Sequence, residues 1–282
     1  MTYCIEEING EREISKLDQM TLNRAREVAI SAAYEAGRLT RERFGTLDHY
    51  EEKDDHGDIV TEVDHLAEAI ILNKIRLVFP DHKIRSEEYG ENDMQSDWTW
   101  LVDPLDGTNN FAIGMPLFGI SITLVFERTV VLAVIYEPMT DRLYVSSENE
   151  GTYCNTKPVS MGAAKAFKKA RVGWIQGHAV QNEQRAVKLR HYIDVNTKRM
   201  MRLWAPTLQW TMLARGDLDA IIVYNSEGED LYSGILMVKE AGGVIFDYDG
   251  NPFSGMIGQP YLIACHPEHK SYFMNMIKEG LS

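Results

Sequence analysis

Two aspartates in one short turn are the residues of this sequence best placed to do chemistry. The stretch 100–111 reads WLVDPLDGTNNF, in which Asp103 and Asp106 follow an apolar run. Such a run predicts a buried strand, and Pro104 would end regular strand pairing so that both carboxylates project from one turn. Uncompensated carboxylates at the buried end of a strand are electrostatically unfavourable. We therefore expect a positive partner, and a hard divalent cation is the simplest candidate.

The residues after the aspartates would suit an anion beside that cation. Gly107 permits a close backbone approach, and Thr108 is a favourable cap for a helix whose first N–H groups would face the anion. Asp-Pro and Asp-Gly are also common in surface turns without any ligand. Turns of that kind rarely follow a run as apolar as 98–102, so the metal-site interpretation is favoured.

This stretch resembles the signature of the inositol monophosphatase family of metal-dependent, lithium-sensitive sugar phosphatases. That signature is an apolar strand followed by D-P-[ILV]-D-G-T-x-N-F, and 103–111 matches every position. Three further segments occur in the family's order: DIVTEVD at 58–64, SEE at 86–88 and DLYSGILMVKEAGG at 230–243. The resemblance extends from about Leu22 to the C-terminus.

The resemblance implies a site for two or three Mg²⁺ ions. Glu87, Asp103 and the main-chain carbonyl of Leu105 would hold the first ion. Asp103, Asp106 and Asp230 would hold the second, so that Asp103 bridges the two. A third, weaker ion would share Glu87. Such oxygen atoms are the proper ligands of a hard ion.

The resemblance also implies the catalytic residues. Asp64 and the Thr108 hydroxyl would orient the attacking water near Glu87, and the N–H groups of Gly107 and Thr108 would bind phosphate oxygens. No covalent enzyme intermediate is needed, so no Cys, Ser or His is assigned as a nucleophile. Thr61 and Asp64 also fit a simpler role as capping groups of a helix, although the family match favours the catalytic role for Asp64.

The assignment of Glu87 depends on the order of the family's motifs. Lys83 to Glu88 predicts a short strand with Glu87 at its end and Glu88 as an outward neighbour. An isolated Glu-Glu pair is usually a solvated surface feature. The metal, however, needs more oxygen ligands than two aspartates supply.

The side that would meet the alcohol part of the substrate departs from the family pattern. The last metal aspartate usually stands in W-D-x-A-A-G, whereas 229–234 reads EDLYSG. Val223 replaces a glutamate that binds ring hydroxyls in inositol-hydrolysing members, and Trp204 begins WAP where those members have G-[ST]-A. Glu229 would either reach substrate hydroxyls or face water. We therefore predict retained chemistry, changed specificity and substrate contacts from Trp204, Val223 and Glu229.

Net charge limits the classes of molecule that this protein is expected to bind, and the cysteine pattern bears on disulfide bonding. With 29 basic and 42 acidic residues the formal charge is −13. Nucleic acid and anionic membranes require a positive surface and are disfavoured, whereas bound cations would attract a small phosphate ester. Cys4, Cys154 and Cys265 are isolated and odd in number, against a disulfide framework. The start of the chain is acidic and no apolar run has membrane-spanning length, which predicts a cytoplasmic protein.

The apolar pattern predicts an α/β protein. Helical spacing occurs at 22–44, 63–79, 180–192, 206–215, 231–241 and 267–280, and 117–153 predicts an antiparallel meander followed by a hairpin at 151–159. The charged segment 50–57 is expected to be a loop. The resemblance implies a layered αβαβα sandwich with mixed and antiparallel sheets, and usually a homodimer. We expect an N-terminal extension at 1–20 and one domain at 21–282, with packed halves of roughly 21–160 and 161–282.

These observations predict a Mg²⁺-dependent phosphomonoester hydrolase. Its substrate would be a sugar, cyclitol, nucleotide or amino-alcohol phosphate other than inositol 1-phosphate. The alternatives are an inositol-1-monophosphatase proper, or a bisphosphate-directed relative such as a fructose-1,6-bisphosphatase or a 3′-phosphoadenosine phosphatase. A non-catalytic, metal-binding pseudo-phosphatase is a further alternative, although a binding subunit would not need to keep Glu87, Asp103, Asp106, Thr108 and Asp230.

Overall fold

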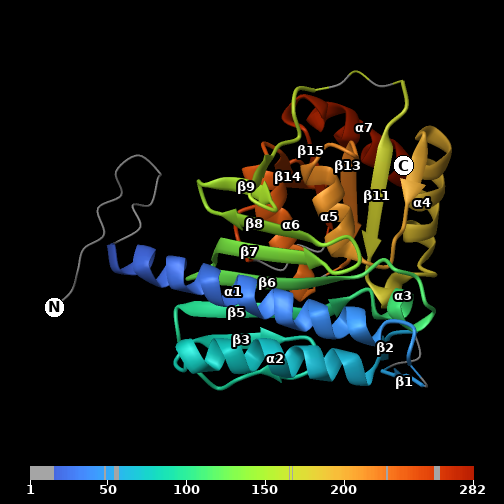
Figure 1. Ribbon diagram of the computed structural model, residues 1–282. Helices are drawn as coiled ribbons and strands as arrows, with labels where there is room; N and C mark the ends of the chain where they lie inside the picture. The colour runs from blue at the N-terminus through green and yellow to red at the C-terminus, as the bar shows by residue number, and fades with distance from the viewer. Residues whose placement is uncertain are drawn as a thin grey trace.

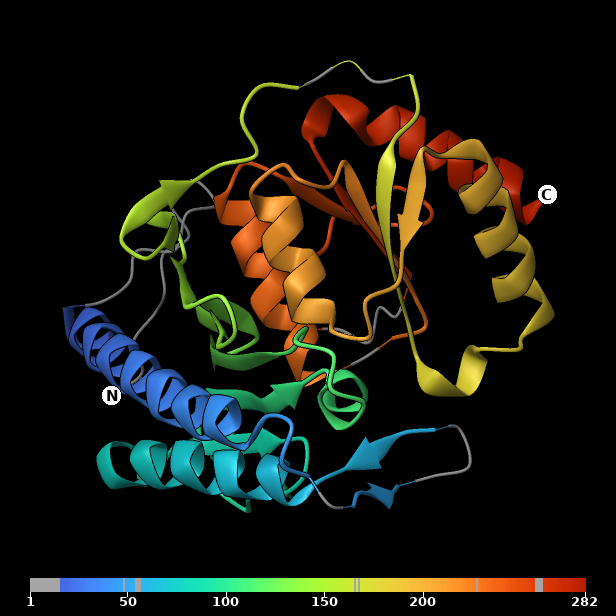
Figure 2. The same ribbon diagram turned by 45° about the vertical axis from the view of Figure 1, so that its right-hand side comes forward.

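Helices and sheets alternate in five layers (Figure 1). The computed structural model describes residues 16–47, 49–53, 57–164, 166, 168–226, 228–256 and 261–282. One outer layer holds α1 (Lys16–Arg43) and α2 (Glu62–Val78), and the other holds α4 (Gln184–Asn196) and α7 (Lys270–Leu281). Between the two sheets lie α5 (Pro206–Ala214) and α6 (Glu229–Glu240), side by side (Figure 2). The predicted αβαβα sandwich is therefore confirmed.

The larger sheet carries the strand that ends in the two aspartates. Its strand order is β10-β9-β8-β7-β6-β5-β3-β4. The bounds are β3 Lys83–Ser86, β4 Gly90–Glu91, β5 Trp98–Asp106, β6 Gly119–Phe126, β7 Thr129–Glu137, β8 Arg142–Ser147, β9 Gly151–Cys154 and β10 Lys157–Val159. β3 and β5 are parallel, and the other neighbours are antiparallel. The predicted meander and hairpin thus correspond to β6–β10.

The smaller sheet has the strand order β12-β11-β13-β15-β14. Its strands are β11 Arg171–Gln176, β12 Arg199–Met201, β13 Ala220–Tyr224, β14 Val244–Asp247 and β15 Tyr261–Cys265. β11 is parallel to β12 and to β13, whereas β15 is antiparallel to β13 and β14. A short helix, η1 (His178–Val180), follows β11, and η2 (Pro267–His269) precedes α7.

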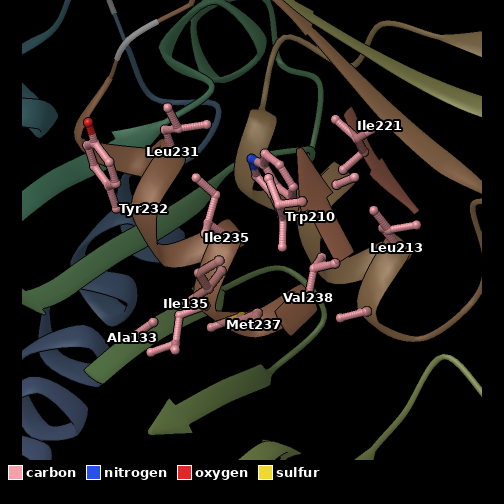
Figure 3. Close-up of a cluster of buried hydrophobic side chains, with 14 of the residues drawn as sticks. Ala133, Ile135, Trp210, Leu213, Ile221, Leu231, Tyr232, Ile235, Met237 and Val238 are labelled. Atoms are coloured by element: carbon pink, nitrogen blue, oxygen red, sulfur yellow. The ribbon is translucent and has the colours of Figure 1, made fainter. Parts of the chain in front are cut away.

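The cluster of buried apolar side chains between the sheets joins the two halves of the molecule (Figure 3). Trp210 of α5 contacts α6 at Gly234, where an added Cβ would lie 2.0 Å from the indole ring. Ile135 comes from the larger sheet and Ile221 from the smaller one, and both pack into this cluster. Burial of so much apolar surface on both sides of α5 and α6 fixes the helices against the two sheets.

Several segments differ from the sequence-based predictions. α1 begins at Lys16, earlier than predicted, while 1–15 of the predicted extension lie outside the described residues. The predicted loop at 50–57 is wrong in part, because β1 (Glu51–Glu52) pairs with β2 (Ile59–Val60). The charged sequence gives no sign of a strand, but the pairing with β2 satisfies the backbone N–H and C=O groups of β1.

Two further observations concern the expectations from composition. None of the described helices is long and apolar enough to cross a bilayer. Cys154 is partly buried and Cys265 buried, both as free thiols, and Cys4 lies outside the described residues.

His82, which directly precedes β3, packs against aromatic rings. Its ring stacks on Phe79 at a centroid distance of 4.5 Å, and its Nδ1 accepts a hydrogen bond from Trp100 Nε1 at 3.1 Å. Burial lowers the pKa of His82 to about 4, although Asp81 opposes the shift. Protonation would remove the acceptor and place a charge among apolar rings.

We predict that His82 makes the protein less stable in mild acid. The unfolded state has the higher pKa, so the stabilisation is complete above about pH 6.5 and is lost as the pH falls toward about 4. His82→Gln keeps a hydrogen-bond acceptor but does not titrate. Across this window wild type should lose about 1–2 kcal/mol more unfolding free energy than the variant, after allowance for partial exposure. Urea denaturation at both pH values measures this, and equal losses would contradict it.

Candidate active site

The two aspartates of the motif lie where β5 loses its regular pairing. The register of β5 against β6 shifts between Asp103 and Asp106, as Pro104 predicts. Both carboxylates are buried, with 6% and 5% of the residue surface exposed. Asp103 Oδ1 accepts a hydrogen bond of 3.0 Å from the N–H of Leu105, which holds the turn closed.

Gly107, rather than Thr108, occupies the capping position of α3 (Thr108–Ala112), so the predicted cap is wrong. Gly107 has a left-handed φ of 102°, and a Cβ there would lie 2.9 Å from the Leu117 carbonyl. Thr108 becomes the first helical residue. Its hydroxyl lies 2.8 Å from Asp64 Oδ1 and 3.0 Å from the Leu105 carbonyl, and can donate to either.

Asp64 combines the two roles that its sequence context suggested. At the start of α2 it forms a capping box with Thr61, whose N–H donates to Asp64 Oδ2 at 2.9 Å. The other carboxylate oxygen, Oδ1, faces Thr108. Burial raises the pKa of Asp64, and the hydrogen bonds from Thr61 and Thr108 oppose that shift. Capping therefore fixes the orientation in which Asp64 meets Thr108.

Asp230 comes from the other half of the chain. Gly228 precedes α6, which begins two residues earlier than the predicted helix at 231–241, so that Asp230 lies in its first turn. A carboxylate is favourable there because the helix dipole is positive at its N-terminus. Nevertheless, burial raises the pKa of Asp230 to about 7, with further contributions from Glu229 and Glu87.

Carboxylates from β5, from α6 and from the segment after β3 lie close together in this site. Burial raises the pKa of Asp103 well above its usual range, and Glu87, Asp106 and Asp230 raise it further. Burial also raises that of Asp106, with Asp230 as the next cause. Within the described residues, no salt bridge neutralises Asp103, Asp106 or Asp230. The arrangement fits a bound cation, which would replace the missing positive charge.

Glu87 directly follows β3, as predicted, but Glu88 is not its outward neighbour. The Glu88 side chain is only 7% exposed and that of Glu87 is 31% exposed. Lys53, beside β1, lies 2.9 Å from Glu87 and 2.5 Å from Glu88. Burial raises the pKa of Glu88 to about 7, although the hydrogen bond from Lys53 opposes this. The strand ends at Ser86, so the alternation that would turn Glu88 outward does not apply.

Two supporting residues were not found from the sequence. Glu68 of α2 is buried and accepts hydrogen bonds from the hydroxyl of Ser86 and the N–H groups of Glu88 and Tyr89, which holds the segment around Glu87. Thr207 of α5 donates its N–H at 2.7 Å, and also its hydroxyl, to Asp106 Oδ2. Both contacts are distant in sequence, and neither residue stands in a motif.

These side chains border a pocket of about 520 Å³. Glu87, Asp103, Leu105, Asp106, Gly107, Thr108 and Asp230 all line it. Asp64 is not among the lining residues and reaches the pocket through Thr108. The structure thus brings the predicted metal and phosphate residues together.

Two of the three residues predicted to contact the substrate line the pocket, and the third does not. Trp204 and Glu229 line the pocket, but Val223 is wholly buried in the core between the sheets. Alternation along β13 turns Val223 toward α5 and α6 together with Ile221, so the prediction for Val223 is wrong. Glu229 does not simply face water, because its Oε1 lies 2.7 Å from Arg85 Nε.

Comparison with known proteins places this chain among the phosphatases, which are phosphoric monoester hydrolases. More specifically, the chain belongs to the inositol monophosphatase family, whose model matches residues 21–279. Inositol monophosphatase 1 of Solanum lycopersicum is 32% identical over 259 residues, covering 89% of this chain and 93% of that protein. The fructose-1,6-bisphosphatase/inositol-1-monophosphatase of Aquifex aeolicus is 32% identical over 232 residues, covering 80% and 86%.

Solved structures agree with this assignment. The crystal structure of the extragenic suppressor protein suhB from Bartonella henselae matches with a TM-score of 0.84 and 27% identity, covering 91% of this chain and 99% of that one. The Thermotoga maritima IMPase TM1415 matches with a TM-score of 0.80 and 26% identity, covering 90% and 97%.

We predict that Thr207 supports activity through Asp106. Thr207→Val removes the hydroxyl donor and keeps the shape of the side chain. Because residues that orient a metal ligand typically contribute at least tenfold, kcat/KM for phosphate release should fall about tenfold or more. Thr207→Ser keeps the hydroxyl and should remain within about threefold of wild type. Steady-state phosphate release and thermal unfolding of all three proteins test this. Equal activity of the Val and Ser variants would show that the hydroxyl is not required.

Proposed function

We propose that this protein hydrolyses a small phosphomonoester with Mg²⁺ at the group of buried acids. The observation that supports this most directly is the meeting of Asp103, Asp106 and Asp230, whose charges no described side chain neutralises by a salt bridge. Such an arrangement is unfavourable in the protein alone and becomes favourable with divalent cations. A surface turn or a purely structural network would pair these acids with Lys or Arg.

The proposed ligands follow the family pattern. Glu87, Asp103 and the Leu105 carbonyl would hold one ion, and Asp103, Asp106 and Asp230 the other, with room for a weaker third ion at Glu87. Among the described residues, no three Asp, Glu, His or Cys side chains already form a ready-made cage. Mg²⁺ usually keeps several water molecules, and substrate phosphate would complete its coordination shell.

The chain's own residues would position the reactants. Bound Mg²⁺ would supply the positive charge that lowers the pKa of a water molecule and stabilises the leaving oxygen. Thr61 orients Asp64, Asp64 accepts from the Thr108 hydroxyl, and the pair would in turn orient the attacking water. The N–H groups at Gly107 and Thr108 would bind phosphate oxygens. No side chain needs to become phosphorylated.

The substrate is proposed to be a sugar, cyclitol, nucleotide or amino-alcohol phosphate other than inositol 1-phosphate. The support for this is Trp204, which lines the pocket where the family pattern has a small G-[ST]-A segment. The second candidate function is that of an inositol monophosphatase or a fructose-1,6-bisphosphatase, because similar proteins carry these names. The cytoplasmic location, the homodimer and the lack of a nucleic-acid partner stay predictions from the sequence.

Replacement of one metal aspartate should abolish activity without unfolding the protein. Asp103→Asn and Asp230→Asn remove a charge that neighbouring acids repel, so in EDTA neither variant should unfold at a lower temperature than wild type. Phosphate release should fall by about a thousandfold or more, because carboxylate ligands are lost. Asp194→Asn, on the exposed side of α4, is the matched control and should behave like wild type. Retained phosphate release in either ligand variant would overturn the metal assignment.

The reaction class and the specificity can be measured together. A mixed panel of phosphomonoesters, including inositol 1-phosphate, is incubated with Mg²⁺, with EDTA and with Mg²⁺ plus lithium. Turnover should require Mg²⁺, fall in lithium and be fastest for an ester other than inositol 1-phosphate. Preferential hydrolysis of inositol 1-phosphate would refute the specificity. Mg²⁺ binding without any turnover would instead support a pseudo-phosphatase.

A further inference from the structure

We propose that the pocket contains a second, anion-binding subsite formed by Arg202 and the side-chain amide of Gln176. Its ligand would be a phosphate or carboxylate group on the alcohol half of the substrate. This inference rests on the proposed function, because the acids must take the phosphate that is hydrolysed.

The charges around the pocket are strongly asymmetric. Six acidic residues line it: Asp58, Glu87, Asp103, Asp106, Glu229 and Asp230. Within the part of the chain that the structure describes, Arg202 is the only Arg or Lys among the lining residues. The acids come mainly from the larger sheet and α6, whereas Arg202 follows β12 at the edge of the smaller sheet. The two kinds of charge therefore belong to different walls.

Arg202 is not consumed by an ion pair. Among the described residues no carboxylate lies within 4.0 Å of it, and its one recorded hydrogen bond is a long one, 3.4 Å from Nη2 to the Gln181 side-chain oxygen. Burial lowers the pKa of the Arg202 guanidinium, and Arg202 in turn helps lower that of Arg190. Two guanidinium groups near one another without a carboxylate would be stabilised by an anion.

The neighbouring amide is oriented as a donor. Gln176 Oε1 accepts two hydrogen bonds, from Trp174 Nε1 at 2.8 Å and from Arg190 Nη1 at 2.5 Å. With its oxygen occupied, the side chain can offer only its NH₂ group to the pocket. Arg190 also donates to the main-chain carbonyl of Gln181 at 3.0 Å, so it fixes both glutamines that line this wall. A guanidinium and an amide NH₂ select an acceptor with several oxygens.

The adjacent loop is built to present Trp204 beside this subsite. Trp204 has a left-handed φ of 53°, which is unfavourable for a bulky residue, and is 55% exposed on the pocket wall. The strain is held by the Asn110 side chain, which donates at 2.6 Å to the Leu203 carbonyl. The indole would then contact the carbon skeleton between the two anionic groups.

Binding is measured on an Asp64→Asn background in Mg²⁺, so that turnover does not interfere. Two matched pairs of probes are titrated by calorimetry: glucose 1,6-bisphosphate against glucose 1-phosphate, and 3-phosphoglycerate against glycerol 3-phosphate. The first pair tests a second phosphate and the second a carboxylate. The added variants are Arg202→Gln, Arg202→Lys and, as a control that removes one positive charge outside the pocket, Arg199→Gln.

At least one dianionic probe should bind about tenfold or more tightly than its partner, as expected for charge-assisted hydrogen bonds. Arg202→Gln should remove that preference and leave the simpler probe within about threefold, whereas Arg202→Lys should restore part of it and Arg199→Gln should keep it. No preference in either pair, or an equal loss for both members, would overturn the subsite. Arg202-dependent binding without phosphate release from the Asp64-containing protein would instead refute only the proposed function.

Discussion

Repulsion among buried carboxylates is the constraint on which this structure depends. Asp103 and Asp106 come from the end of one strand, Asp230 from the first turn of a helix in the other half, and Glu87 from the end of a parallel neighbour strand. Burial raises the pKa of Asp103, Asp106 and Asp230, and the charges of neighbouring acids raise it further, so the acids would separate if the chain were free to move. The surrounding fold must supply the stability that holds them together until a cation binds.

That stability comes from contacts that cross between the halves of the molecule. Trp210 against Gly234 fixes α5 to α6, and α6 packs on the larger sheet through the shared apolar cluster. Near the site, Arg85 of β3 forms a salt bridge with Glu229 at the start of α6. The segments that deliver Glu87 and Asp230 are therefore tied directly to each other. Because these ties are far apart in sequence, the site exists only when both halves have folded.

The parts of the site that sequence could predict are local ones. Asp103 to Phe111 is a single turn and short helix whose residues are close in sequence, so pattern and resemblance identify them together. Thr207 and Glu68 escaped prediction because each acts on a residue that the fold, not the sequence, brings near it. Val223 shows the opposite failure: its match to a ring-binding glutamate of the family predicts a pocket position, but strand alternation turns it into the core. The layers of the fold and the motif at 103–111 can thus be predicted from local sequence. The side of the strand that Val223 occupies and the contacts of Thr207 and Glu68 depend on tertiary structure.

The acids and the predicted contacts for the alcohol half of the substrate lie on different walls of the pocket, which bears on substrate specificity. The acids and their supports belong to the larger sheet, α2, α5 and α6, where a substitution disturbs a charge balance shared by several groups. The opposite wall consists of the end of β11 and the loop after β12, which carry Gln176, Arg202 and Trp204. Changes there alter what the alcohol half meets without moving a carboxylate. Asn110 joins the two walls through its hydrogen bond to the Leu203 carbonyl, whereas Thr207 of α5 holds Asp106 within the acidic wall. A change of specificity must therefore preserve both contacts to preserve the chemistry.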